Sequence, residues 1–306
     1  MTARVSEGTH SGNLKLSDWA TLIVIACIWG SSFFLIATGL DSMSAAVVGF
    51  CRIACGALAL SCIPSARRVT IDKADWKMIT LLGAIWMAIP LLAFPIAEQW
   101  ISSALAGMLN GGVPVVTAVV GVALGLKHPA RIQQVGLVVG LAGIVLISLP
   151  SLQLGGNDAA GVGVVAIALV CYAFSATFAV PLQHKYGGPA LMLRVEAIGA
   201  VLACPVAIAT FGDTHFAWKS VLAVMVLGVL GTGVAFALMA SVIGRVGATR
   251  ATMVTYLMPP VSIALGVIVR NETVSGLGVV GVVIVLIGAF LLSRQPAAVD
   301  SPTSDD

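Results

Sequence analysis

Charge is the property that this sequence has least of. Only 9% of its 306 residues are Asp, Glu, Lys or Arg, whereas 59% are hydrophobic and the mean hydropathy is +1.05. Soluble domains carry about 25% charged residues and roughly 45–50% apolar ones. A soluble core cannot absorb this composition, so the sequence predicts a protein whose solvent is lipid.

The motifs of nucleotide and metal chemistry are missing as well. The sequence contains no GxxxxGK[ST] loop for ATP and no HExxH pair for zinc. The 4 histidines all fall in expected tails or loops: His10, His128, His184 and His215. The 6 cysteines include no CxxC pair and lie in apolar stretches, which favours small buried side chains over a disulfide or metal set. We expect no cofactor, no metal and no nucleic-acid partner.

Long hydrophobic runs fill the chain between two polar tails, 1–16 and 295–306, which we expect to be disordered. A helix needs about 20 apolar residues to cross a bilayer core of about 30 Å. Runs of this kind occupy 19–38, 44–63, 77–97, 101–125, 131–149, 159–182, 189–210, 219–241, 247–269 and 275–293. The sequence therefore predicts an all-α membrane protein with ten transmembrane helices, the first of them uncleaved, and no extramembrane domain.

The positive charges predict the orientation of these spans. With the N-terminus in the cytoplasm, most of the 16 Lys and Arg residues fall in cytoplasmic segments. Only Lys219 and Arg270 fall on the other side, while Arg52 and Arg194 lie within spans. Because Lys and Arg accumulate in cytoplasmic loops of membrane proteins, we expect both termini in the cytoplasm.

The chain also contains an internal repeat. AGMLNGGVPVV (106–116) aligns with ATMVTYLMPPV (251–261), and GLAGIVLIS (140–148) aligns with VLIGAFLLS (285–293), both at an offset of 145 residues. The repeat divides the chain into a first half, 17–150, and a second half, 151–294. Since each half holds an odd number of spans, five, the second half is expected to be inverted in the membrane. Inverted repeats open a shared central cavity to alternate sides.

Six stretches of sequence match one known family. They are WGSSFF (29–34), CRIACGAL (51–58), SSALAGMLNGGVPVVTAV (102–119), GLVVGLAGIVLIS (136–148), GATRATMVTYLMPPVSIALG (247–266) and GVVGVVIVLIGAFLLS (278–293). Through them the chain resembles the drug/metabolite transporter superfamily, specifically the bacterial EamA-type ten-span permeases. The resemblance implies an inner (plasma) membrane location and a cavity lined by spans 1, 3, 4, 6, 8 and 9, with spans 5 and 10 at the periphery. One departure is that an acidic residue usual after spans 4 and 9 is kept at Glu272 but replaced by Lys127.

Polar and aromatic residues on the lining spans are the candidates for binding substrate. We expect the cavity to be lined by Trp29, Ser32, Phe33, Trp86, Asn110, Gly111, Tyr172, Phe178, Thr255 and Tyr256. Further candidates on the same spans are Ser31, Phe94, Gly112, Phe174, Ser175, Thr232 and Phe236.

Three prolines predict interruptions of the helices next to these residues. A proline removes the hydrogen bond to the carbonyl four residues back. Pro114, Pro259 and Pro260 should therefore break their helices and free the carbonyls of Asn110, Thr255 and Tyr256. Freed carbonyls are tolerated at membrane depth where they line a cavity. The alternative is that the prolines only kink the helices for packing.

Ionisable residues within the spans are few: Arg52, Arg194 and Glu196, with Glu98 at a span end. We expect Arg194 to snorkel to the cytoplasmic boundary, and Arg52 to pair with Glu196 across the halves or to remain unpaired. No carboxylate lies at mid-depth on an expected lining span, which favours facilitated or weakly coupled transport over a proton relay.

Together these features predict an exporter, and not an enzyme, that moves small neutral or zwitterionic metabolites by alternating access. Hydrophobic or aromatic amino acids are the first expectation, and efflux of lipophilic or quaternary-ammonium compounds is the alternative. An intramembrane enzyme acting on lipids and a purely structural or regulatory subunit are the remaining classes. The partners we expect are a small-molecule substrate and the lipid bilayer, with a monomer and a homodimer both open.

Overall fold

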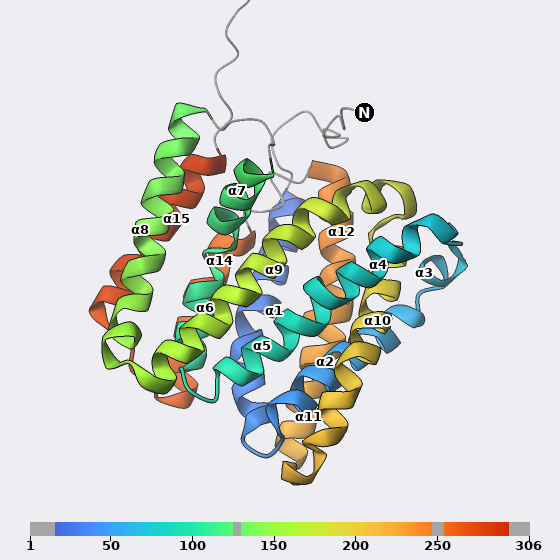
Figure 1. Ribbon diagram of the computed structural model, residues 1–306, viewed down its shortest axis with the longest axis horizontal. Helices are drawn as coiled ribbons and strands as arrows, with labels where there is room; N and C mark the ends of the chain where they lie inside the picture. The colour runs from blue at the N-terminus through green and yellow to red at the C-terminus, as the bar shows by residue number, and fades with distance from the viewer. Residues whose placement is uncertain (1–15, 125–129, 247–253, 294–306) are drawn as a thin grey trace, which may run out of the picture.

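The computed structural model describes residues 16–124, 130–246 and 254–293, and this part of the chain is almost entirely helical, without a strand (Figure 1). The helices are α1 (Leu16–Leu40), α2 (Ala45–Ser61), α3 (Pro64–Arg68), η1 (Lys73–Asp75), α4 (Trp76–Leu82), η2 (Gly83–Ala88), α5 (Ile89–Ala97), α6 (Ser103–Asn110), α7 (Val113–Ala123), α8 (Arg131–Leu154), α9 (Gly156–Tyr186), α10 (Gly188–Ala209), η3 (Phe211–Asp213), α11 (Trp218–Val226), η4 (Leu227–Val234), α12 (Ala235–Val246), α14 (Val254–Arg270) and α15 (Gly276–Ser293).

Within the described residues, each predicted run falls on one helix or on successive helices. Six helices are long and apolar enough to cross a membrane, and α6 with α7, bent by 41°, makes a seventh if the pair is one span. α2, α15 and most of α14 are apolar but shorter. A multi-pass, all-helical membrane protein is thereby confirmed, whereas the count of ten spans stays a prediction. The polar tails, apart from Leu16, and the segment 247–253 lie outside the described residues.

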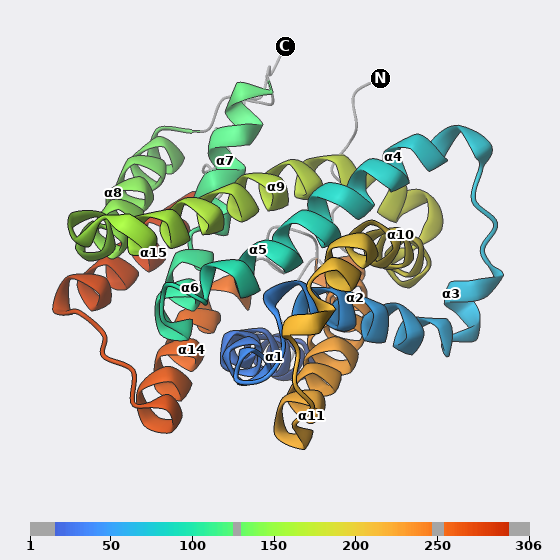
Figure 2. The same ribbon diagram turned by 60° about the horizontal axis from the view of Figure 1, so that its bottom comes forward.

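α8 and α15 lie side by side at one edge of the bundle in both ribbon views (Figures 1 and 2). Glycines bring their backbones into direct contact. A β-carbon placed on Gly143 would lie 2.6 Å from the backbone nitrogen of Val285, and one on Gly281 would lie 2.8 Å from that of Ile147. Small residues allow such close approach between membrane helices. This pair forms the periphery that the family resemblance implies for spans 5 and 10.

Helix packing repeats between the two halves of the chain. α2 packs on α10, α6 on α14 and α8 on α15, and each pair joins helices at equivalent repeat positions. The contact of α1 with α14 has its counterpart in α9 with α7, and that of α2 with η4 in α10 with η2. The core therefore lies between the halves rather than within either one.

η2 and η4 are π-helices, in which the backbone bonds from residue i to i+5 widen one turn. The repeat offset places Gly83, the first residue of η2, on Gly228 in η4. A β-carbon on Gly83 would meet Ile198 of α10 at 2.6 Å, and one on Gly228 would meet Cys55 of α2 at 2.5 Å. The wide turn of each half thus contacts the other half, η2 at α10 and η4 at α2.

Candidate functional site

The site begins at the break between α6 and α7. α6 ends at Asn110, two glycines follow, and α7 starts at Val113 with Pro114 in its first turn. The two helices meet at an angle of 41°. Glycine and proline together explain the break, because proline cannot bond backwards and the glycines remove side-chain support for a continuous helix.

The second predicted break is not seen. α14 continues from Val254 to Arg270 through Pro259 and Pro260 without interruption. It packs instead on the glycines of α6: a β-carbon on Gly111 would lie 2.7 Å from Cγ of Pro259, and one on Gly107 would overlap Ser262. Gly111 therefore serves the contact between α6 and α14 and does not line the cavity described next.

A cavity of about 270 Å³ lies between the halves. The predicted residues that line it are Trp29, Ser32, Phe33, Trp86, Phe94, Asn110, Tyr172, Phe236 and Thr255. It is also lined by Arg52, Leu91, Val113, Ala176, Ala179, Val180, Gln183, Met192, Met239 and Met258. Pockets for drug-sized ligands measure about 300–1,000 Å³, so this cavity suits a small metabolite.

Phe178, Ser31 and Ser175 were also predicted to line the cavity and are not brought to it. Phe178 lies beside Phe174, with ring centroids 5.9 Å apart, and packs on the core around α10. Ser31 lies on the opposite side of α1, and Ser175 is fully buried with its hydroxyl donating to the carbonyl of Cys171. The side chain of Tyr256 is outside the described part of the chain.

Sequence reasoning missed the contribution of α2 and α10. Arg52 of α2 and Met192 of α10 both line the cavity, although the resemblance implied neither span. The one available signal was Arg52 itself, a charge in the middle of an apolar run, since such residues usually face a cavity or the protein interior.

Aromatic rings form two groups in the lining. Phe236 contacts Trp29 and Trp86 edge to face, with centroid distances of 5.3 Å and 5.8 Å. The indole N–H of Trp29 donates to the carbonyl of Gly231 in η4 over 2.9 Å, which fixes its ring. In the second group, Phe94 lies 5.4 Å from Phe33 and 6.2 Å from Tyr172.

Polar groups in the lining are few and partly unsatisfied. Asn110 is 7% exposed and its Oδ1 has no hydrogen-bond partner in the described residues. Arg52 is 6% exposed, and its Nε donates to Oγ1 of Thr232 over 3.2 Å. No ion pair joins Arg52 to Glu196 within the described ranges, and both oxygens of Glu196, fully buried behind the lining, lack a partner there. The pairing of Arg52 with Glu196 is therefore not formed in this structure.

Arg194 donates hydrogen bonds to backbone carbonyls at the end of α3. Its guanidinium donates to the carbonyls of Ala66, Arg67 and Val69, at the end of α3, the latter two over 3.1 Å and 2.8 Å. These carbonyls lie in the segment between the second and third predicted spans, which is expected at the cytoplasmic boundary, so the snorkelling of Arg194 stays a prediction.

One end of the bundle is formed by the turns 41–44, 98–102, 210–217 and 271–275, which are joined by hydrogen bonds and an ion pair. There Glu272 accepts three hydrogen bonds at the start of α6. These come from the backbone nitrogen and hydroxyl of Ser103, at 3.1 Å and 2.7 Å, and from the backbone nitrogen of Ala104 at 2.8 Å. Arg270 bonds Asp41 at 3.1 Å. These contacts join the two halves.

The opposite end has its own contacts between the halves. Lys185, near the end of α9, forms ion pairs with Asp72 at 2.5 Å and with Asp75 at 2.7 Å. The hydroxyl of Tyr186 donates to Asp75 over 2.5 Å. The lining of the cavity includes residues towards this opposite end, namely Gln183 near the end of α9 and Met239 of α12.

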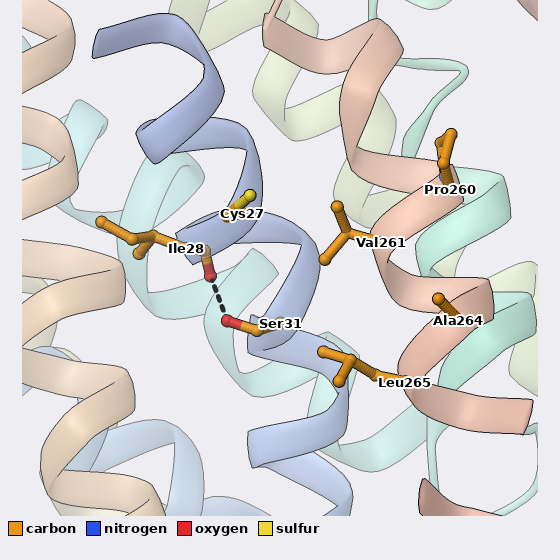
Figure 3. Close-up of a pocket in the computed structure, with 7 residues that line it drawn as sticks. All are labelled: Cys27, Ile28, Ser31, Pro260, Val261, Ala264 and Leu265. Carbon is orange, nitrogen blue, oxygen red and sulfur yellow. Dashed lines mark hydrogen bonds between the residues drawn. The ribbon is translucent and has the colours of Figure 1, made fainter. Parts of the chain in front are cut away.

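A second hollow lies on the surface between α1 and α14 (Figure 3). Its lining residues are Cys27, Ile28, Ser31, Pro260, Val261, Ala264 and Leu265. The hydroxyl of Ser31 donates to the carbonyl of Ile28 over 2.9 Å, so the one polar side chain is already satisfied. A shallow apolar groove without converging polar groups suits contact with lipid and is not a candidate for specific binding.

Sequence comparison agrees with a cavity set between two related halves. The profile of the EamA-like transporter family matches the chain twice, at 18–149 and at 159–294. The chain belongs to the EamA-like transporter family. It is 27% identical over 290 residues to YedA of Escherichia coli K12, an inner membrane transporter described as uncharacterized, and the match covers 91% of this chain and 93% of YedA.

Other relatives of this EamA-like transporter point the same way. It is 23% identical over 267 residues to YdfC of Bacillus subtilis 168, described as an uncharacterized transporter, covering 85% of this chain and 86% of YdfC. An uncharacterized transporter of Archaeoglobus fulgidus is 21% identical over 280 residues, and the match covers 92% of this chain and 100% of the relative. One crystal structure matches with a TM-score of 0.64 over 91% of this chain and 96% of its own, and at 15% identity it shows the fold alone. The protein is a multi-pass membrane transporter.

Proposed function

We propose that the protein exports small neutral or zwitterionic metabolites, hydrophobic or aromatic amino acids first, by alternating access across the bacterial inner membrane. The observation that carries this proposal is the cavity of about 270 Å³ between the halves, which combines two aromatic groups with a few polar side chains. Rings provide an apolar surface for the side chain of an amino acid, while Asn110 and Arg52 offer hydrogen bonds to its polar end.

The proposal includes ten spans in two inverted halves, 17–150 and 151–294, with both termini in the cytoplasm. Under that orientation, the lining of the cavity includes residues towards the cytoplasmic end, from which an exporter loads its substrate. Each end of the bundle carries its own contacts between the halves, at Glu272 and at Lys185. Separate contacts at each end are what alternating access requires, since one set opens while the other closes.

Efflux of lipophilic or quaternary-ammonium cations is the alternative within the transporter class. Aromatic faces attract such cations. The guanidinium of Arg52 in the lining, however, repels a cation and leaves an anion or zwitterion favoured.

Counterflow in proteoliposomes tests the proposal. Liposomes are loaded with an unlabelled amino acid and given the labelled form outside, across the twenty common amino acids. We expect accumulation of an apolar or aromatic subset, and a fall of about tenfold or more when Trp86 is replaced by Ala, because the ring that contacts the substrate is lost.

Trp218→Ala is the matched control, since this tryptophan is 69% exposed and far from the cavity lining. It should leave the rate unchanged. Accumulation of no amino acid would overturn the proposed substrate class, and lipophilic cations under a proton gradient would be tried next. Equal rates for Trp86→Ala and Trp218→Ala would instead show that substrate passes elsewhere.

A further inference from the structure

Arg52 is a buried cation in the wall of the cavity. Its side chain is 6% exposed, and it forms no ion pair within the residues that the structure describes. The carboxylates of Glu98 and Glu196 are buried in its neighbourhood, yet neither forms a hydrogen bond in the described ranges and neither lines the cavity. A buried charge is costly unless it is paired, and within membranes such charges mark substrate pathways.

The guanidinium is held in one orientation. Oγ1 of Thr232 accepts from Nε of Arg52 over 3.2 Å and donates to the carbonyl of Leu227 over 3.4 Å. Thr232 is fully buried in the π-helix η4 of the other half. Within the described residues, the side chain of Arg52 thus forms its hydrogen bond through Nε alone. The Nη1 and Nη2 amino groups are left to bind a ligand in the cavity. Two parallel N–H groups on a planar fork match the two oxygens of a carboxylate.

The rest of the lining complements a carboxylate that carries an apolar body. Asn110 lines the same cavity with an unpartnered Oδ1, which can accept a hydrogen bond from an ammonium or hydroxyl group. Phe236 holds Trp29 and Trp86 together as an apolar wall. The guanidinium of Arg52, a hydrogen-bond acceptor and an aromatic wall therefore surround one cavity of about 270 Å³.

We propose that Arg52, positioned by Thr232, binds the carboxylate of the transported molecule, so that the substrates are small carboxylates with an apolar or aromatic side chain. The inference rests on the proposed function and deepens it. The substrate must then carry a carboxylate to bind, whereas its amino group contributes less to binding.

Binding to the purified wild-type protein tests this without any variant. Trp29 and Trp86 lie in the cavity, so quenching of their fluorescence reports occupancy. The probes are L-phenylalanine, phenyllactate, phenethylamine and L-phenylalanine methyl ester. We expect phenyllactate to bind within about tenfold of phenylalanine, and the two probes without a carboxylate to bind at least about tenfold more weakly.

Variants test the residue itself. Arg52→Gln should weaken the binding of phenylalanine about tenfold or more. Arg52→Lys keeps the charge but loses the planar fork, so its affinity should lie between those of the wild type and Arg52→Gln. Thr232→Val, which removes the acceptor for Nε but keeps the volume, should weaken binding by a smaller factor. The control is Arg131→Gln, an exposed arginine at the start of α8, which should bind as the wild type does.

The outcomes separate the two proposals. Phenethylamine or the methyl ester binding as well as phenylalanine would overturn the role of Arg52 while amino-acid transport still stands. Arg52→Gln and Thr232→Val both binding within twofold of the wild type would overturn it too. Absence of binding by either carboxylate probe to the wild-type protein, together with no counterflow, would overturn both proposals. If Arg52→Gln does not fold, the ligand series and Thr232→Val still decide the question.

Discussion

Replacing Gly288 with leucine is expected to abolish the accumulation of folded protein in the membrane. A β-carbon at this position of α15 would lie 2.6 Å from Cα of Gly140 and 2.7 Å from the carbonyl oxygen of Gly136, both backbone atoms of α8. Backbone cannot rotate away as a side chain can, so α8 and α15 must separate along their contact. Overpacking of this kind typically costs about 1–3 kcal/mol, and more where nothing can yield.

The measurement is the yield of monodisperse protein after extraction in mild detergent, followed by its thermal unfolding midpoint. Gly163→Leu is the matched control, because a β-carbon on this helical glycine of α9 meets nothing within 4 Å. It adds the same side chain to a surface helix face and should leave the yield unchanged. A Gly288→Leu protein as abundant and as stable as the control would mean that α8 and α15 do not pack as described.

Replacing Glu272 with alanine is expected to give the second-largest loss of stability. The variant removes the acceptor for three N–H and O–H donors at the start of α6, contributed by Ser103 and Ala104. Hydrogen bonds to a charged group contribute about 1.5–3 kcal/mol each, and the four backbone N–H groups at a helix start have no partner within the helix. We expect a net loss of about 3 kcal/mol or more, read as a lower unfolding midpoint in detergent.

Asp41→Asn is the control at the same end of the bundle. Asp41 pairs with Arg270 and Lys219, but its side chain is 39% exposed. Exposed ion pairs contribute about 0–1 kcal/mol, so this variant should unfold close to the wild type. If Glu272→Ala unfolds no earlier than Asp41→Asn, the carboxylate does not join the two halves in the membrane.

The helices could be predicted from the sequence because apolar runs leave the backbone no other way to satisfy its polar groups in lipid. The aromatic lining was also accessible, since Trp29, Trp86 and Tyr172 stand out on the spans that the resemblance implies. What composition cannot tell is which face of each helix turns inwards. Phe178 was expected in the cavity and packs on the core, while Arg52 was not expected there and lines it.

The prolines show a second limit of prediction from the sequence. Pro114 and Pro259 are equivalent by the repeat, yet only the first follows a broken helix. Two glycines precede Pro114 by one turn, whereas Tyr256 and Leu257 stand at the matching positions and favour a continuous helix. The effect of a proline therefore depends on its neighbours, and a symmetric pair of breaks does not follow from a symmetric pair of prolines.

The role of Glu272 could not be read from sequence either. The resemblance presented it as the remaining member of an acidic pair, and the replacement of the other member by Lys127 argued against a symmetric function. In the structure it caps α6 in the first half of the chain, a contact between segments about 170 residues apart that no local pattern encodes.

The matching π-helices carry a consequence for the register of the helices that contain them. A π-turn accommodates one residue more than an α-turn. Because Gly83 and Gly228 occupy the same repeat position and both wide turns are present, the residues after each π-helix are rotated by about one position relative to a continuous α-helix, and the rotation is the same in both halves of the chain.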